Sequence, residues 1–192
     1  MRIKFFIAVI LLLSGLVIGA TAQLADDSQI QPFAPSVQTV ELKLHGIEFN
    51  DGVVGFDKET GRDSMFGYGF HGQTYGALPG VLTLSMNCTP ATFNPGESNE
   101  MTGGTWTLPV YSTRPLYKNP VYLGSFYGHI VSGKLSWEKI SAKMYFTFAI
   151  DGGTVKFTGA TGDGFFEGDL TEPVKGQEEA TIEGVFTLRY TP

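Results

Sequence analysis

The chain has few of the residues, cysteines and basic side chains, that form disulfide frameworks, cysteine-based metal sites and nucleic-acid-binding surfaces. Its 192 residues include a single cysteine, Cys88, and three histidines. One thiol cannot form a disulfide within its own chain, and it excludes a zinc site built from several cysteines. Lysine and arginine number 13 against 19 aspartates and glutamates, a net charge of −6. That balance excludes the basic surface typical of nucleic-acid binding, so no nucleic-acid partner is expected.

Helical periodicity is absent as well. No segment beyond the N-terminus places apolar residues at helical spacing for three turns. The chain has 25 glycines, and a glycine destabilises a helix interior by about 1 kcal/mol. Aromatic residues make up 13% of the chain, which excludes disorder. Composition therefore favours an all-β protein.

The N-terminus predicts an export signal. Two basic residues precede an apolar run at 5–18, and Ala20-Thr21-Ala22 follows as a small-residue cleavage site. We predict a signal peptide at 1–22, cleaved after Ala22, then a flexible leader at 23–36 and secretion to the periplasm or the exterior. The alternative is an uncleaved membrane anchor, for which the apolar run is short. We expect no membrane span after cleavage.

Residues 37–192 alternate between apolar and polar side chains, which is the pattern of β-strands. Gly46 interrupts the first alternation and predicts a bulge, and residues 50–63 are predicted as a loop. About eight such segments follow one another without helices between them. We therefore predict a single domain at 37–192, an eight-stranded antiparallel closed β-barrel. Its interior has room for side chains or for one small ligand.

One glycine-rich segment carries a family resemblance. Residues 152–168, GGTVKFTGATGDGFFEG, resemble a stretch of the allene oxide cyclase-like and dirigent-like β-barrels, and Gly103-Gly104-Thr105-Trp106 is similar to bacterial members. The resemblance covers about 37–190. It implies an eight-stranded, calycin-like barrel and a homo-oligomer, either a dimer or the trimer common in the plant members. The chain departs from the family at Val155-Lys156, where Gly-Arg is common.

The glycines of this segment are predicted to form a structural turn motif. Glycine tolerates positive φ and close packing, which suits tight turns and a bulge. A phosphate-binding glycine loop would need a helix N-terminus after it, whereas here a strand follows. The predicted turn residues are Gly152, Gly153, Gly159, Gly162 and Gly164.

Three functions remain open at this point. The first is a secreted protein that binds a small apolar molecule inside the barrel. The second is a cofactor-independent isomerase or cyclase, similar to the allene oxide cyclase-like and dirigent-like proteins, which steers an apolar substrate. The third is a surface interaction protein without a small ligand. Large apolar side chains on inward faces would either line a pocket or fill the core. The predicted ligand-pocket residues are Trp106, Phe146, Phe148, Phe166 and Phe186.

The candidate catalytic residues are Glu167, His129 and Tyr127. Tyr127 and His129 share a strand face opposite Phe126. They lie outside the barrel if the apolar face points inward, and they line the cavity with Glu167 and Arg189 if it does not. The sequence contains no Gly-x-Ser-x-Gly elbow and no closely spaced histidine pair. We therefore predict neither a metal nor a cofactor.

Overall fold

The computed structural model describes residues 36–116, 119–173 and 178–192. The predicted signal peptide, and the predicted leader up to its last residue, lie outside the described residues. The elements are β1 (Gln38–Asn50), β2 (Val53–Asp57), β3 (Arg62–Gly76), β4 (Gly80–Thr89), β5 (Ser98–Tyr111), β6 (Tyr122–Glu138), β7 (Ser141–Gly153), the one-turn 3-10 helix η2 (Val155–Phe157), β8 (Thr161–Thr171) and β9 (Thr181–Thr191). Over these ranges, no helix has the length and hydropathy needed to cross a membrane.

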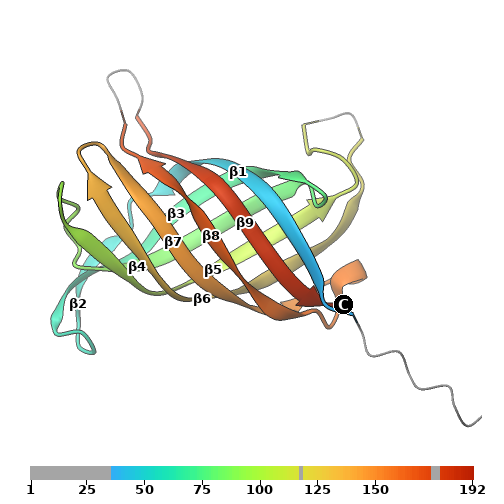
Figure 1. Ribbon diagram of the computed structural model, residues 1–192, viewed down its shortest axis with the longest axis horizontal. Coiled ribbons are helices and arrows are strands. Elements are labelled where there is room, and N and C mark those ends of the chain that lie inside the picture. Colours follow the sequence, from blue (N-terminus) through green and yellow to red (C-terminus); the bar gives the residue numbers. More distant parts are fainter. Residues whose placement is uncertain (1–35, 117–118, 174–177) are drawn as a thin grey trace, which may run out of the picture. The chain divides into compact units, whose positions relative to one another are not determined.

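The strands confirm the predicted fold class. Each strand from β3 to β9 pairs antiparallel with the next, and β1 pairs with both β3 and β9. These eight strands form a closed barrel, and they wrap steeply around it in Figure 1. β2 pairs with β3 and projects from one end of the barrel. Closure pairs the backbone groups of every barrel strand on both sides, so the barrel wall has no free edge.

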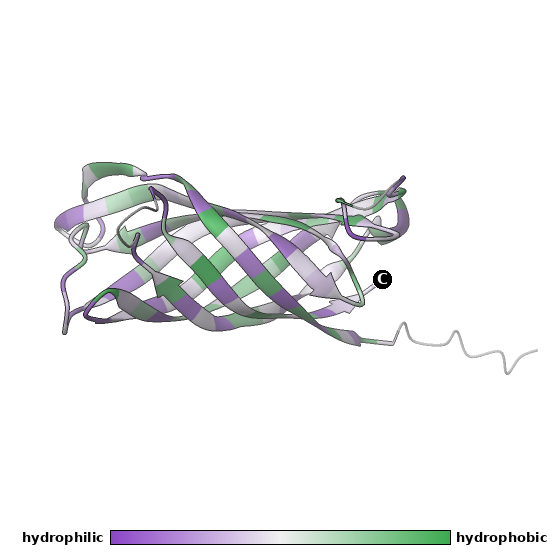
Figure 2. Ribbon diagram, turned by 90° about the horizontal axis from the view of Figure 1, so that it is seen from above, coloured by the Kyte–Doolittle hydropathy of each residue, from purple (hydrophilic) through white to green (hydrophobic). Residues whose placement is uncertain are grey.

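Side chains alternate across the barrel wall as the sequence pattern predicts. In β1, Leu42 and Leu44 are buried, whereas Lys43 and His45 between and beyond them are exposed. Figure 2 shows the same alternation of hydrophobic and hydrophilic residues along the other strands. The inward faces form one continuous apolar core, which stabilises the barrel by removing these side chains from water.

Aromatic side chains from two connecting segments cover the opposite ends of the barrel. At one end, Phe93 of the β4–β5 loop packs between Tyr68 and Trp137, with ring centroids 5.4 and 5.3 Å away. At the other end, Phe157 of η2 packs on Phe126 at 4.2 Å. The interior is thereby covered by side chains at both ends.

Asn99 attaches the β4–β5 loop to the barrel. Its side-chain amide donates to the carbonyl oxygens of Pro90 and Thr92 at 2.7 and 2.9 Å, and its Oδ1 accepts from the indole N–H of Trp137 at 2.8 Å. Asn99 is fully buried, so its hydrogen bonds replace those that water would otherwise provide.

Two local predictions were wrong. The predicted loop at 50–63 contains β2, because Val53, Val54 and Phe56 pair with the start of β3 in spite of the glycines around them. Gly46 does not form a bulge: β1 stays in register with β9 through it, and the register with β3 shifts between Glu48 and Asn50. A Cβ on Gly46 would lie 2.7 Å from the His71 carbonyl oxygen, so this glycine permits the close approach of β1 and β3.

Candidate functional site

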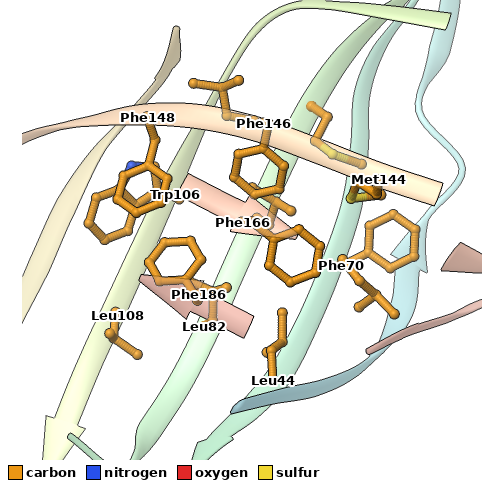
Figure 3. Packing of buried hydrophobic residues seen from close by; sticks show 14 of the residues in the cluster. Leu44, Phe70, Leu82, Trp106, Leu108, Met144, Phe146, Phe148, Phe166 and Phe186 are labelled. Carbon is orange, nitrogen blue, oxygen red and sulfur yellow. The ribbon is translucent and has the colours of Figure 1, made fainter. Parts of the chain in front are cut away.

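The five aromatic residues predicted to line a ligand pocket lie together in the middle of the barrel (Figure 3). Phe148 stacks on Phe186 with ring centroids 4.2 Å apart and planes 5° apart, and Trp106 packs on both. Phe146 stacks on Phe166 at 5.1 Å. None of the five is more than 1% exposed. A ligand at this position would have to displace side chains that already contact one another.

The candidate catalytic residues are not brought together. Tyr127 and His129 lie on the outer face of β6, and His129 Nδ1 is 2.8 Å from a carboxylate oxygen of Asp151. Glu167 also faces outward, on β8, and its cross-strand row reaches β6 at Lys134. Lys134 is five residues beyond His129, about 16 Å along a strand. A shared proton-transfer site for the three residues is therefore not formed.

The predicted turn glycines surround η2. Gly152 and Gly153 end β7, Gly159 lies between η2 and β8 at φ 84°, and Gly162 and Gly164 are in β8. Val155, the first residue of η2, has φ 54°, a left-handed conformation that a β-branched residue rarely adopts. Val155 therefore occupies backbone geometry that favours glycine.

The two other candidate reactive side chains, Cys88 and Asp57, are buried and hydrogen-bonded, respectively. Burial raises the pKa of the Cys88 thiol to about 12, which keeps it protonated and unreactive. Asp57 accepts hydrogen bonds from the backbone N–H of Glu59 and the hydroxyl of Thr60, both at 2.9 Å, and these lower the pKa of its carboxyl. Among the residues placed by the structure, no group of three or more His, Cys, Asp or Glu side chains could hold a metal ion.

A groove runs across the strands on the outer face of the barrel, and we call it the belt groove. Its central section, of about 660 Å³, lies over β1, β7, β8 and β9. A section of about 330 Å³ extends it toward β6 and shares Lys143 and Glu167 with the centre. A section of about 290 Å³ extends it beyond β3 and shares Tyr75. The three sections therefore adjoin one another along the outer wall from β6 to β3.

Two rows of outward side chains form the walls of the belt groove. Members of each row are direct cross-strand partners, from β6 through β7, β8, β9 and β1 to β3. The first row is Lys134, Tyr145, Glu167, Val185, Lys43 and Tyr75. The second row is Ser136, Lys143, Asp169, Glu183, His45 and Gln73. Strand spacing makes the groove about 24 Å long, and the two-residue step along each strand separates the rows by about 7 Å.

The floor of the groove is the barrel backbone between the two rows. At its centre lie Gly168 and Gly184, which are paired in register and have no side chains. A Cβ on Gly168 would collide with the Glu183 carbonyl oxygen and would lie 2.6 Å from the ring of Phe166. A side chain at either position would point into the barrel, so the two glycines let the sheet pack closely over Phe166.

Several charged groups of the groove lie in pairs of opposite sign. The ammonium of Lys143 lies 2.6 Å from a carboxylate oxygen of Asp169, and Nδ1 of His45 lies 2.6 Å from one of Glu183. The hydrogen bond to Asp169 and its charge raise the pKa of Lys143. The three sections are lined by charges of both signs, with four cationic side chains (Lys43, Lys134, Lys143 and Arg114) and three carboxylates (Glu167, Asp169 and Glu183).

Two tyrosines of the first row are held in place by neighbours. Tyr145, 48% exposed, stacks on Phe165 with centroids 6.2 Å apart. The ring of Tyr75 lies 4.6 Å from the guanidinium carbon of Arg114, and its hydroxyl donates to Gln73 at 3.2 Å. These contacts restrict ring rotation, which lowers the entropy lost when a ligand binds.

No family model, curated protein or solved structure matches the chain. The resemblance to allene oxide cyclase-like and dirigent-like barrels therefore stays a prediction.

The prediction from sequence named only Glu167 among the groove residues. A local signal for the others exists: outward residues flank an inward glycine in Glu167-Gly168-Asp169 and in Glu183-Gly184-Val185. That these two triplets lie side by side depends on the β8–β9 register, which the local pattern does not contain.

Proposed function

We propose that this chain is an exported, non-catalytic binding protein whose ligand occupies the belt groove. The observation that carries the proposal is the series of three adjoining hollows along two rows of outward side chains. A concave site with convergent polar groups on a rigid wall is the usual form of a ligand site. The closed barrel supplies the rigid wall, since its strands are paired on both sides.

The packing of the interior favours the outer face. Trp106, Phe148 and Phe186 contact one another and are each at most 1% exposed, so an interior ligand would require repacking of the core. Interior binding of a small apolar molecule stays a prediction with its own outcome in the experiment below. The cyclase-like alternative also stays a prediction, and the separation of Glu167 from His129 does not favour it.

Residues 23–192, labelled with ¹⁵N, test where a ligand binds. The probes are palmitate, cellopentaose, pentagalacturonate and pentaglycine, each titrated to millimolar concentration while amide resonances are recorded. We expect at least one polar probe to shift amides on both sides of the Gly168–Gly184 floor. Shifts confined to inward-facing residues with palmitate, or no shifts with any polar probe, would overturn the proposal.

A blocking variant supplies the control. Val185 lies in the central section of the groove, and Val185→Arg places a long charged side chain there. Val131→Arg makes the same change at an exposed β6 position that lines none of the three sections. We expect Val185→Arg to abolish the shifts and Val131→Arg to preserve them. Equal loss in both variants would contradict binding in the groove.

A further inference from the structure

We propose that strand β2 is the dimerisation edge of this protein, on which β2 of a second copy pairs antiparallel. β2 lines none of the three sections of the belt groove, so its pairing does not depend on a ligand there. Three properties of β2 support the pairing: a free backbone edge, exposed apolar side chains on both faces, and a sequence that complements itself when it is reversed.

One edge of β2 has no strand beside it. β2 pairs with the start of β3 and projects past the end of the barrel (Figure 1), whereas the pairing of β1 with β9 ends at Ile47. The Asp57 carbonyl accepts a hydrogen bond from the N–H of Gly61 at 2.9 Å, so it points toward the turn into β3. Because backbone groups alternate along a strand, those of Val54 and Phe56 point away from β3. Within the part of the chain that the structure describes, no backbone group pairs with them.

Apolar side chains cover both faces of this edge. Val54 and Phe56 point to one face and are 59% and 65% exposed, and Val53 points to the other face and is 69% exposed. Phe66, the cross-strand partner of Val53, is 37% exposed beside it. Proteins usually protect an edge strand with a charged residue, a proline or a bulge, and residues 53–56 have none of these. A free edge of this composition is a site for pairing with another strand.

A second copy of β2 is the strand that this edge fits. Two antiparallel copies related by a two-fold axis at Gly55 place Val54 of each copy opposite Phe56 of the other. A β-branched residue opposite an aromatic one is a favourable cross-strand pair. Both residues direct their backbone groups outward, so each pair exchanges two hydrogen bonds and the interface gains about four. Gly55 has no side chain at the axis, where two identical side chains would otherwise meet.

The same register brings opposite charges together at each end of the interface. Lys58 of one copy extends next to Gly52 and Asp51 of the other. Burial, a hydrogen bond with Asp51 and the charge of Asp51 raise the pKa of Glu48, so these two residues form a close carboxyl pair. An ammonium group beside this pair reduces the repulsion between its carboxylates.

The size of the surface predicts a weak dimer. Val53, Val54, Phe56 and Phe66 together expose about 400 Å² of apolar surface in each copy. With the backbone of the paired edges, two copies bury about 1,000 Å² in total, which is the lower limit for a specific interface. We therefore expect monomer and dimer to exchange at micromolar concentration, with a dissociation constant of about 1–100 μM.

The turn after β2 disfavours a lipid surface as the partner. Charged residues occupy the tip of the β2–β3 hairpin, beyond the apolar ones: Asp57, Lys58, Glu59, Arg62 and Asp63. A hairpin inserted into a bilayer would carry these charges toward the hydrocarbon, where they are strongly disfavoured. Pairing along the edge of β2 leaves the tip in water.

Sedimentation equilibrium of residues 23–192 at about 1–500 μM, on either side of the expected dissociation constant, tests the association. We expect the mass to rise from one copy to two over this range. Val54→Lys places a charge at the paired edge and should weaken dimerisation at least tenfold. Val131→Lys is the matched control, because Val131 is similarly exposed, 56% against 59%, on a strand whose two edges are paired. A monomer at every concentration, or equal weakening by the two variants, would overturn the proposal.

Cysteine variants test the register. Gly55→Cys places two thiols at the two-fold axis, where the Cα atoms are about 4.5 Å apart, within the range that a disulfide spans. A Cβ at Gly55 lies 3.5 Å from the ring of Phe66, an ordinary contact, so the position accepts the side chain. Val53→Cys is the control, because its two copies would lie four residues apart along the strands, about 13 Å. We expect mild oxidation to cross-link only Gly55→Cys, since the native Cys88 is buried. Equal cross-linking of the two variants would contradict this register.

The remaining outcomes identify another partner or another face. If the protein stays monomeric but sediments with phosphatidylcholine vesicles, and Val54→Lys abolishes this, the edge contacts lipid and the dimer proposal is wrong. A dimer that Val54→Lys leaves intact uses another face of the barrel, which also overturns the proposal.

Discussion

Replacement of Val155 by glycine is expected to stabilise the protein. Val155 begins η2 at φ 54°, and a non-glycine residue held in this region costs about 1–3 kcal/mol, with β-branched residues at the upper end. Glycine adopts the conformation without this cost. The side chain of Val155 is 63% exposed, so its loss removes little buried surface. The greater freedom of glycine in the unfolded chain costs about 0.5–1 kcal/mol in return. The free energy of unfolding of Val155→Gly is therefore expected to exceed that of the unchanged protein by about 1 kcal/mol.

A second valine isolates the conformational strain. Val131 lies in β6, is 56% exposed and has a negative φ. Val131→Gly incurs the same entropy cost and a similar loss of burial, without relief of strain, and should destabilise the protein by about 1 kcal/mol. The two variants should therefore differ by about 2 kcal/mol.

Urea unfolding of residues 23–192 measures the difference, and thermal unfolding repeats it. For a domain of this size, 1 kcal/mol corresponds to about 2–4 °C in the midpoint. Val155→Gly should raise the midpoint and Val131→Gly should lower it. If both variants lower it equally, the left-handed geometry of Val155 carries no strain and the reasoning fails.

Three further predictions concern the core. Burial raises the pKa of Cys88 from 9.0 to about 12, so the unfolded chain loses the thiol proton at a lower pH than the folded protein does. Between pH 9 and pH 10 the free energy of unfolding, measured with urea, should therefore fall by about 1 kcal/mol. Cys88→Ala should remove this decline. Asn99→Ala leaves the Trp137 indole N–H and two loop carbonyls without their hydrogen-bond partner, and it should lower the free energy of unfolding in urea by about 2–4 kcal/mol. The control Asn94→Ala, at an exposed position, should lower it by at most about 0.5 kcal/mol. Gly128→Ala places a Cβ against the Ala149 carbonyl oxygen and should leave no folded barrel by circular dichroism, and a cooperative native-like transition would contradict this.

The alternation of residue types was sufficient to predict the barrel strands. Leu42 and Leu44 face inward and Lys43 faces outward because successive side chains of a strand point to opposite sides. The same rule holds for Phe146 and Phe148 in β7. Strand β2 was missed because it has only five residues and contains Gly55, so its alternation is too short to detect.

The belt groove could not be predicted, because it depends on long-range register. Lys43 and Val185 are cross-strand neighbours, although 142 positions separate them in the chain. A shift of one residue in either strand would turn one of them inward, and the local pattern does not exclude such a shift. The role of Gly46 was misread for a similar reason: the His71 carbonyl that requires a glycine there belongs to another strand.

The glycine floor of the belt groove has a consequence for how this protein could change over evolutionary time. Gly168 and Gly184 separate the groove from the ring of Phe166 by a single thickness of backbone. A substitution at Phe166 would therefore alter the curvature of the floor without changing any side chain that lines the groove. Under the proposed function, a substitution in the core would then change ligand preference while the residues of the outer face stay the same. Two relatives with matching walls could then bind different molecules.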